Sequence, residues 1–282
     1  TGVSIAAIMP VDIPEEDSEN VQIIFATSAG DVRRNALSDF TNVRANGKIA
    51  MDLPDNVTLV NARIATQDDD VMLVTKSGRA IRFSTKAVRV FKGRKSTGVR
   101  GVRLTGDDCV VSMSILRHFE ASSDERAAYL KMRRAVAGMV DDEGAGTEDE
   151  EVSANATISP ERYAEMSAAE NLILTISSRG SGKLSSSHDY PVRGRGGMGV
   201  AAMDKAMRGG DLVASFPVDL EDQIMLATSK GQSIRVPIEG ISFRSRSAGG
   251  VKVFNTGNNE EVVSVARIVE QSEEEEAPQS EA

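Results

Sequence analysis

The sequence predicts an all-β fold, a propeller-like array of four-stranded blades that carries a small two-helix insertion. One strand-and-turn pattern occurs four times, the copies are spaced about one blade apart, and the chain between the second and third copies changes character. The 282 residues are 40% hydrophobic and 27% charged, as in an ordinary globular chain. Only 4% are aromatic and Trp is absent, so we expect an aliphatic core.

Each copy has an apolar strand, a turn glycine, a polar or basic strand, a basic loop, a second glycine and a closing apolar strand. Copies 1 to 4 open at Val21, Val71, Asn171 and Gln223. The expected turn glycines are Gly30, Gly78, Gly180 and Gly231, and the expected second glycines are Gly47, Gly98, Gly197 and Gly249. The short Val/Ile/Leu/Thr runs end at glycine, so each copy predicts one blade whose apolar surface only neighbouring blades can cover. Residues 3–11 match a closing strand and are expected to end an earlier, truncated copy.

Residues 117–170 interrupt the repeats. Ser122 precedes Glu125 by three positions, which predicts a capping box at the start of a helix. Ser159 followed by Pro160 predicts the start of a second helix, because Pro is tolerated at the first helical position. The expected organisation is therefore a β-array over 1–268, truncated at its N-terminal end and interrupted at 117–170, followed by a disordered acidic tail at 269–282.

The net charge of −9 argues against nucleic-acid binding until its distribution is considered. Residues 141–151 hold seven acids and no base, and residues 269–282 hold six acids and no base. We interpret both runs as a solvated linker and tail, because they contain too little apolar surface to fold. Without them, 33 bases face 29 acids.

The bases gather at equivalent repeat positions. The stretches from turn glycine to closing strand, 31–50, 79–104, 179–203 and 230–254, hold 22 of the 33 bases and four acids. In a stacked array such positions share one face, so they predict a continuous basic stripe suited to the repeating phosphates of duplex DNA. The alternative is a solvated charged face. The expected DNA-binding residues are Arg33, Arg34, Arg44, Lys48, Arg79, Arg82, Lys86, Arg89, Lys92, Arg94, Lys95, Arg100, Arg103, Lys183, Arg193, Arg195, Arg235, Arg244, Arg246 and Lys252.

Other motifs predict no chemistry. Residues 194–199 satisfy G-x-G-x-x-G, but a β-repeat follows where a dinucleotide site needs a helix. His118 and His188 are too few for most zinc sites, and the single Cys109 allows no internal disulfide. No apolar run reaches the roughly 18–20 residues of a membrane-spanning helix. Because residue 1 is Thr, we expect this chain to be part of a longer one.

The repeats resemble the C-terminal domain of the DNA gyrase A protein, which is part of a type IIA topoisomerase. The resemblance covers about 1–116 and 171–268 and is clearest at VQIIFATSAGDVRRNALSDF from Val21, SGRAIRF from Ser77 and QIMLATSKGQSIRV from Gln223. The family's glycine-rich basic box is absent, and the run Arg193–Gly199 resembles a weaker copy of it. The insert also departs from the common form of the family.

The resemblance implies a β-pinwheel, in which blades exchange strands and duplex DNA wraps around a basic rim. It implies an ATP-hydrolysing topoisomerase that introduces negative supercoils. Catalytic residues would lie in the N-terminal part of the gyrase A protein, and ATP and Mg²⁺ would be bound through the gyrase B protein of an A2B2 heterotetramer. We therefore expect no catalytic residue, metal or cofactor in this chain, double-stranded DNA as a partner, no membrane, and a cytoplasmic location.

Two alternatives remain open. The equivalent domain of the topoisomerase IV C protein is also a basic pinwheel, and it serves decatenation. A propeller that only scaffolds protein contacts belongs to a different functional class. A scaffold would show no steep salt dependence of DNA affinity, because it releases no counterions.

Overall fold

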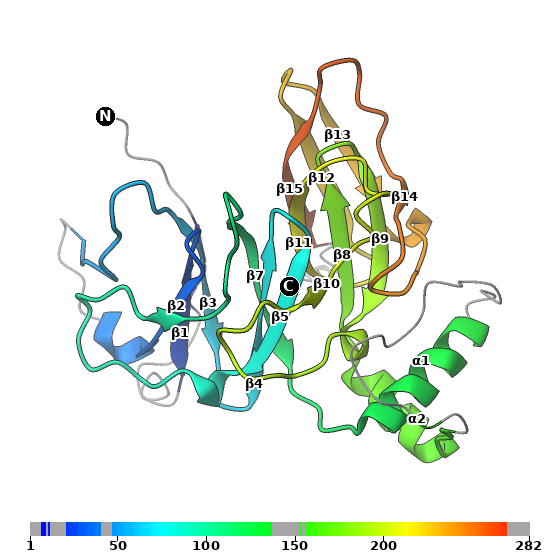
Figure 1. The fold of residues 1–282 in the computed structure, drawn as a ribbon, viewed down its shortest axis with the longest axis horizontal. Coiled ribbons are helices and arrows are strands. Elements are labelled where there is room, and N and C mark those ends of the chain that lie inside the picture. The colour runs from blue at the N-terminus through cyan, green and yellow to red at the C-terminus, as the bar shows by residue number, and fades with distance from the viewer. Residues whose placement is uncertain are drawn as a thin grey trace, which may run out of the picture.

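The protein is an open array of four antiparallel sheets with two α-helices at one side (Figure 1). The computed structural model describes residues 7–9, 11, 21–40, 47–136, 153 and 156–269. The acidic run at 141–151 and all but the first residue of the tail at 269–282 lie outside the described residues.

Blades 1 and 2 each contain four strands. The order in blade 1 is β3 (Leu59–Ala65), β1 (Gln22–Thr27), β2 (Asp31–Ala36) and β6 (Val99–Arg100). The order in blade 2 is β7 (Val110–Arg117), β4 (Asp69–Thr75), β5 (Arg79–Ser84) and β10 (Val200–Ala201).

Blade 3 also has four strands, whereas blade 4 has three among the described residues. The order in blade 3 is β11 (Leu212–Val218), β8 (Leu172–Ser177), β9 (Ser181–Ser186) and β14 (Val251–Lys252). The order in blade 4 is β15 (Val262–Ile268), β12 (Gln223–Thr228) and β13 (Ser233–Pro237).

The outer strand of each complete blade comes from the following copy. β6 of copy 2 pairs with β2, β10 of copy 3 pairs with β5, and β14 of copy 4 pairs with β9. Each short strand therefore links one blade to the next, and the expected pinwheel exchange of strands is confirmed. No described strand pairs with the outer side of β13.

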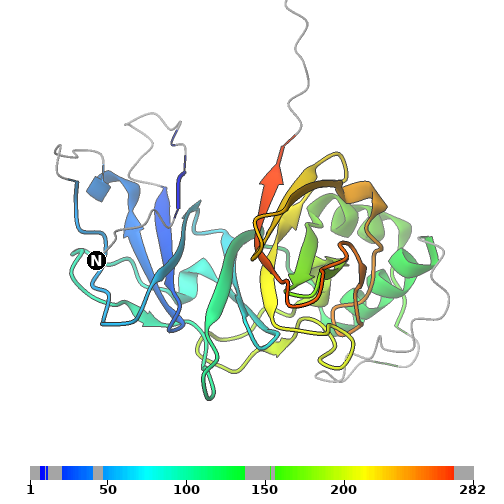
Figure 2. The same cartoon turned by 90° about the horizontal axis from the view of Figure 1, so that it is seen from above.

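Blade 2 lies between blade 1 and blade 3 (Figure 2), and both faces of its central strand β4 are covered. Successive side chains of a strand point to opposite faces. Val71 and Leu73 of β4 pack in the core shared with blade 1, and Met72 and Val74 pack in the core shared with copy 3. This explains why β4 is continuously apolar from Val71 to Val74, and the aliphatic core is confirmed.

The four turn glycines have φ values that only glycine adopts without strain: 86° at Gly30, 91° at Gly78, 75° at Gly180 and 81° at Gly231. The prediction for the second glycines is wrong in two copies. Gly197 and Gly249 do not directly precede the exchanged strands.

The glycines that do so are Gly98, Gly199 and Gly250, directly before β6, β10 and β14. A Cβ at Gly98 would collide with the carbonyl of Val32, and one at Gly199 would collide with the carbonyl of Ala80. Close approach of the exchanged strand to its acceptor therefore selects glycine at this position.

The insertion forms α1 (Ser123–Val136) and α2 (Pro160–Ala169), as predicted. The capping box is present: Glu125 N–H donates to Ser122 Oγ at 3.2 Å, and Ser122 N–H donates to the Glu125 carboxylate at 2.8 Å. His188 of copy 3 joins the helices to the array. Its Nε2 lies 2.8 Å from the carbonyl oxygen of Met166, and its ring packs edge-on against Tyr129.

Candidate nucleic-acid interface

The basic loops of copies 2 to 4 run along the outer edges of the preceding blades. We call residues 88–98, 190–199 and 241–250 the rim loops. Isolated parallel bridges join Arg34 to Val90, Arg82 to Val192 and Leu184 to Phe243, so each rim loop lies against the second-outermost strand of the blade before it. The repeat therefore places the loops on successive blades along one edge of the array.

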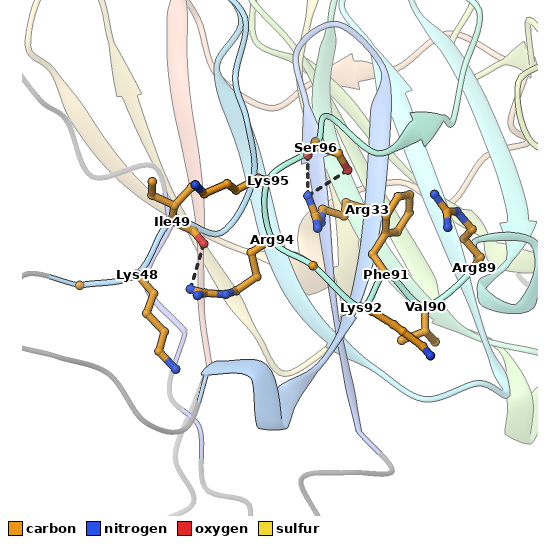
Figure 3. A pocket seen from close by; sticks show the side chains of 12 residues that line it. Arg33, Lys48, Ile49, Arg89, Val90, Phe91, Lys92, Arg94, Lys95 and Ser96 are labelled. Atoms are coloured by element: carbon orange, nitrogen blue, oxygen red, sulfur yellow. Dashed lines mark hydrogen bonds between the residues drawn. The ribbon is translucent and has the colours of Figure 1, made fainter.

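The first rim loop borders a hollow of about 1530 Å³, which Figure 3 shows from close by. Residues 47–49 of copy 1 form its other side. None of the twelve lining residues is acidic. Six are cations: Arg33, Lys48, Arg89, Lys92, Arg94 and Lys95.

Several of these cations are held in place by their surroundings. The guanidinium of Arg89 lies 4.1 Å from the centroid of the Phe91 ring, a cation–π contact. Arg94 donates to the carbonyl oxygen of Ile49 at 3.2 Å. Lys92 and Lys95 are exposed. The hollow thus combines two positioned guanidinium groups with two exposed ammonium groups.

Further predicted cations line the same edge. Arg195 of the second rim loop donates to the carbonyl oxygens of Ala87 and Arg100 at 2.9 and 3.0 Å. It therefore spans the first two blades along the edge. Other exposed members of the predicted set are Arg100, Arg103, Arg193, Arg235 and Lys252, and half-buried members are Lys48, Arg79, Arg94 and Arg244. Lys86 is exposed but forms an ion pair with Asp68 at 2.8 Å.

Five of the predicted DNA-binding side chains lie inside the protein, and the structure corrects their assignment. Each hydrogen-bonds to other protein groups within or between blades. They are Arg33, Arg34, Arg82, Lys183 and Arg246, all at most 7% exposed.

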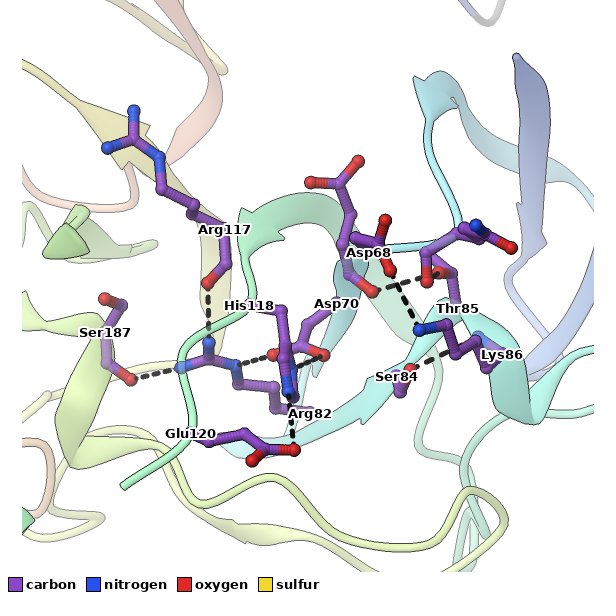
Figure 4. A network of polar contacts seen from close by, with 12 residues as sticks. Asp68, Asp70, Arg82, Ser84, Thr85, Lys86, Arg117, His118, Glu120 and Ser187 are labelled. Atoms are coloured by element: carbon purple, nitrogen blue, oxygen red, sulfur yellow. Dashed lines mark hydrogen bonds and ion pairs between the residues drawn. The ribbon is translucent and has the colours of Figure 1, made fainter. Parts of the chain in front are cut away.

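Arg34 and Arg82 fasten each blade to the 3₁₀ turn of the next copy. Arg34 donates to the carbonyl oxygens of Thr85 and Val88 at 2.9 and 3.1 Å. Arg82 donates to the carbonyl of Ser187 at 2.7 Å and forms a 2.8 Å ion pair with the fully buried Asp70, as Figure 4 shows. Burial lowers the pKa of both guanidinium groups, and Asp70 opposes this effect at Arg82. Both remain charged, because an arginine does not deprotonate in proteins.

Lys183 and Arg246 have the same kind of role between copies 3 and 4. The Lys183 ammonium is fully buried and donates to the carbonyl oxygens of Ser245 and Ala248, both at 2.7 Å. Arg246 donates to the carbonyl oxygens of Asp189 and Ala201 at 2.9 and 2.6 Å. Carbonyl dipoles here replace the water that a buried cation loses.

Arg33 fastens copy 1 to the first rim loop. It donates to the backbone oxygen and the hydroxyl of Ser96 at 2.6 and 3.1 Å and to Asn35 Oδ1 at 2.8 Å. Burial lowers its pKa, whereas the charges of Asp39 and Asp52 raise it.

A sequence signal for the contact that Arg34 and Arg82 make within their own blade exists and was missed. The residues paired with Arg34, Arg82, Leu184 and Arg235 on the preceding strands are Ile24, Met72, Leu174 and Met225. Two residues before these, the same strands carry Gln22, Asp70, Leu172 and Gln223. The three copies with Arg in the second strand have a polar residue, Gln or Asp, near the start of the first strand. Copy 3, which has Leu184 in the second strand, has Leu172 there. Gln22 Oε1 accepts from Arg34 at 2.9 Å, so the joint change follows a direct contact.

Blade 4 presents this repeat position differently. Arg235 is exposed, and no described strand lies beyond β13. Gly231 has no neighbouring atom within 4 Å of the place where its Cβ would lie, whereas a Cβ at Gly180 would collide with the carbonyl of Phe254. Arg44, the remaining predicted residue, lies outside the described residues.

The described residues offer neither a metal site nor a membrane-spanning helix. Within the described ranges, no group of three or more His, Cys, Asp or Glu side chains is arranged to hold a metal ion. None of the described helices combines the length and apolar character needed to cross a membrane.

The chain matches the family model described as DNA gyrase C-terminal domain, beta-propeller, over residues 22–66, 69–117, 171–216 and 222–268. The chain belongs to this family. The four matched segments coincide with the four copies, so the blades observed here are the repeating unit of the DNA gyrase C-terminal domain.

Relatives in several bacteria support this placement. The chain is 44% identical over 277 residues to the DNA gyrase A protein of Granulibacter bethesdensis and 37% identical over 276 residues to that of Rickettsia bellii. These matches cover 94% and 96% of this chain but only 30% of each relative. The chain thus spans about a third of the length of these gyrase A proteins.

Solved structures share the fold. A DNA gyrase A C-terminal domain aligns with a TM-score of 0.62 at 20% identity, covering 89% of this chain and 67% of that chain. The C-terminal domain of a DNA topoisomerase IV aligns with a TM-score of 0.64 at 19% identity, covering 88% and 62%. At these identities the likeness establishes the architecture alone.

Proposed function

We propose that this domain binds duplex DNA along its rim and bends the duplex around the blades. The observation that carries the proposal is the set of exposed cations on the first two rim loops, with the hollow between copies 1 and 2 as the densest site. A phosphate backbone offers a charge about every 1.7 Å of duplex axis, so cations repeated blade by blade can each meet a phosphate.

The aromatic residues favour duplex DNA over a single strand. Proteins that hold single strands stack bases on exposed aromatic rings. The aromatic residues of the rim loops are Phe91, which is buried beneath Arg89, Tyr190, which is buried, and Phe243, which is half-buried beneath Arg133. The rim cations would therefore contact the phosphate backbone of DNA. Such contacts position a duplex without reading its sequence.

In the whole enzyme, this domain would present wrapped DNA to a cleavage core in the N-terminal part of the gyrase A protein. ATP-dependent strand passage would then introduce negative supercoils. ATP and Mg²⁺ would act through the gyrase B protein of a cytoplasmic A2B2 assembly, with no cofactor assigned to this chain.

Topoisomerase IV is the alternative within the same fold. The structural likeness does not separate the two enzymes, since the TM-scores are 0.62 and 0.64. The longer relatives are named as DNA gyrase, which favours supercoiling over decatenation.

The test is the affinity of the domain for a duplex as a function of salt. We expect log affinity to fall linearly with log salt, with a slope of about −0.9 for each phosphate neutralised. A topology assay with nicked DNA and ligase should show a change in linking number that depends on the domain. Affinity that is independent of salt would favour a protein scaffold.

A further inference from the structure

The C-terminal half of α1 lies beside the outer edge of blade 3. The guanidinium of Arg133 on α1 lies 4.7 Å from the ring centroid of Phe243 on the third rim loop. Phe243 is bridged to Leu184 of β9, the second-outermost strand of that blade. Arg133 also forms a 3.1 Å ion pair with Glu170, just after α2. These contacts fix the C-terminal half of α1 against the rim.

The third rim loop has few exposed cations of its own. It contains Arg244, which is half-buried, and Arg246, which is buried and bonded to the carbonyls of Asp189 and Ala201. Lys183 of the same blade is fully buried as well. At blade 3, Lys183 and Arg246 are thus buried and bonded to carbonyl oxygens, whereas at blade 1 several cations line the hollow.

The last two turns of α1 carry cations beside the third rim loop. Lys131 is exposed and Arg134 is half-buried, and neither forms an ion pair with a described residue. They lie three positions apart, so they share one face of the helix. The inward-facing residues Tyr129 and Leu130 hold that face outward.

We propose that α1 is a DNA-contacting part of the rim, and that Lys131 and Arg134 bind phosphates of a duplex passing blade 3. The insertion, which lies beside the blade of β8 and β9 in Figure 1, then compensates for the cations that blade 3 buries. This inference rests on the proposed function, because it assigns further contacts to the same DNA path. Arg133 is a positioning residue, held against Phe243 and Glu170.

The experiment compares three sets of alanine substitutions in the intact chain, measured with a duplex long enough to pass all four blades and with a short one. The test variant is Lys131→Ala with Arg134→Ala. The matched control is Lys205→Ala with Lys230→Ala, which removes two exposed lysines near the turn ends of the strands. The reference variant removes Arg94, Lys95 and Arg100 beside blade 1.

For the long duplex, the test variant should flatten the salt slope by about 1.8 units, because two phosphate contacts are lost. The control should leave the slope unchanged, and circular dichroism should show an unchanged helix content. For the short duplex we expect little effect, since its preferred site is the hollow of blade 1.

An unchanged slope for the test variant, with a flattened slope for the reference variant, would overturn the role of α1 and leave the proposed function intact. Equal losses in the test variant and the control would also overturn it, because net charge alone would explain them. A wild-type domain with no salt-dependent DNA affinity would instead refute the proposed function.

Discussion

Blades 1 and 4 show what a neighbouring copy does to one and the same repeat position. Arg34 in blade 1 is buried beneath copy 2 and donates to two of its carbonyl oxygens. Arg235, its equivalent in blade 4, is exposed at an edge without a described partner strand. Recurrence of a cation therefore does not reveal its role, because the next copy decides whether the side chain joins blades or faces solvent.

The comparison predicts very different stability losses at equivalent positions. Arg82→Met should cost about 3–5 kcal/mol, because it removes the buried arginine from the ion pair with Asp70 and leaves that carboxylate with His118 alone. Arg235→Met should change stability by less than about 0.5 kcal/mol, as at other exposed sites. Urea titration of both variants measures this difference. Similar losses at the two positions would show that blade 4 has a hidden partner for Arg235.

The turn glycines also differ between a blade covered by the next copy and blade 4, and we expect a smaller difference in stability there. Gly180→Ala and Gly231→Ala should each lose about 1–2 kcal/mol, since both residues have positive φ. Gly180→Ala should lose roughly 1–3 kcal/mol more, because its Cβ meets the carbonyl of Phe254 while that of Gly231 meets no atom within 4 Å. Thermal unfolding tests the ranking, and the reverse order would contradict the packing described for the exchanged strand.

As the pH falls, the helical insertion should lose stability at a higher pH than the blades do. Burial lowers the pKa of His188, with Arg82 and Arg126 acting in the same direction and Glu170 opposing. A lowered pKa means that the unfolded state binds the proton more readily. The stability from neutral His188 is therefore complete above its unfolded pKa of about 6.5, and it is lost as pH falls below that value, by at most about 1.4 kcal/mol per pH unit.

Hydrogen exchange between pH 7 and pH 5, corrected for the intrinsic exchange rate, should show α1 and α2 losing protection while the core strands keep theirs. His188→Gln should remove this dependence. An insertion that loosens equally in the variant would show that another group titrates.

The sequence was sufficient for the parts of the fold that lie within one copy. The apolar strand before each turn glycine, the positive-φ glycine and the capped helices depend on local chemistry, so Gly30 and the Ser122–Glu125 box were predictable. Which copy supplies each outer strand depends on contacts with a different copy, far away along the chain, and the repeats alone did not determine it. That is also why the second glycine was misplaced at Gly197 and Gly249.

The candidate site was predictable as a set of loops but not residue by residue. Exposed residues such as Lys92 and Lys95 lie in loops, where a polar side chain faces solvent by default. Arg34 and Lys183 lie within strands and donate to carbonyl oxygens of the next copy, so their burial depends on the array. The joint change of Gln22 and Arg34 to Leu172 and Leu184 between copies records the contact of these two positions but not burial, because Arg235 is exposed although Gln223 stands at the earlier position.

The most direct test of this account compares rim and joint cations by the salt dependence of duplex binding. Replacing Arg94, Lys95 and Arg100 by Ala should flatten the slope of log affinity against log salt by about 2–3 units with little loss of stability. Arg246→Met should lower stability and leave the slope of the folded protein unchanged. A slope unaltered by the triple substitution but flattened by Arg246→Met would contradict the division between cations that bind DNA and cations that join blades.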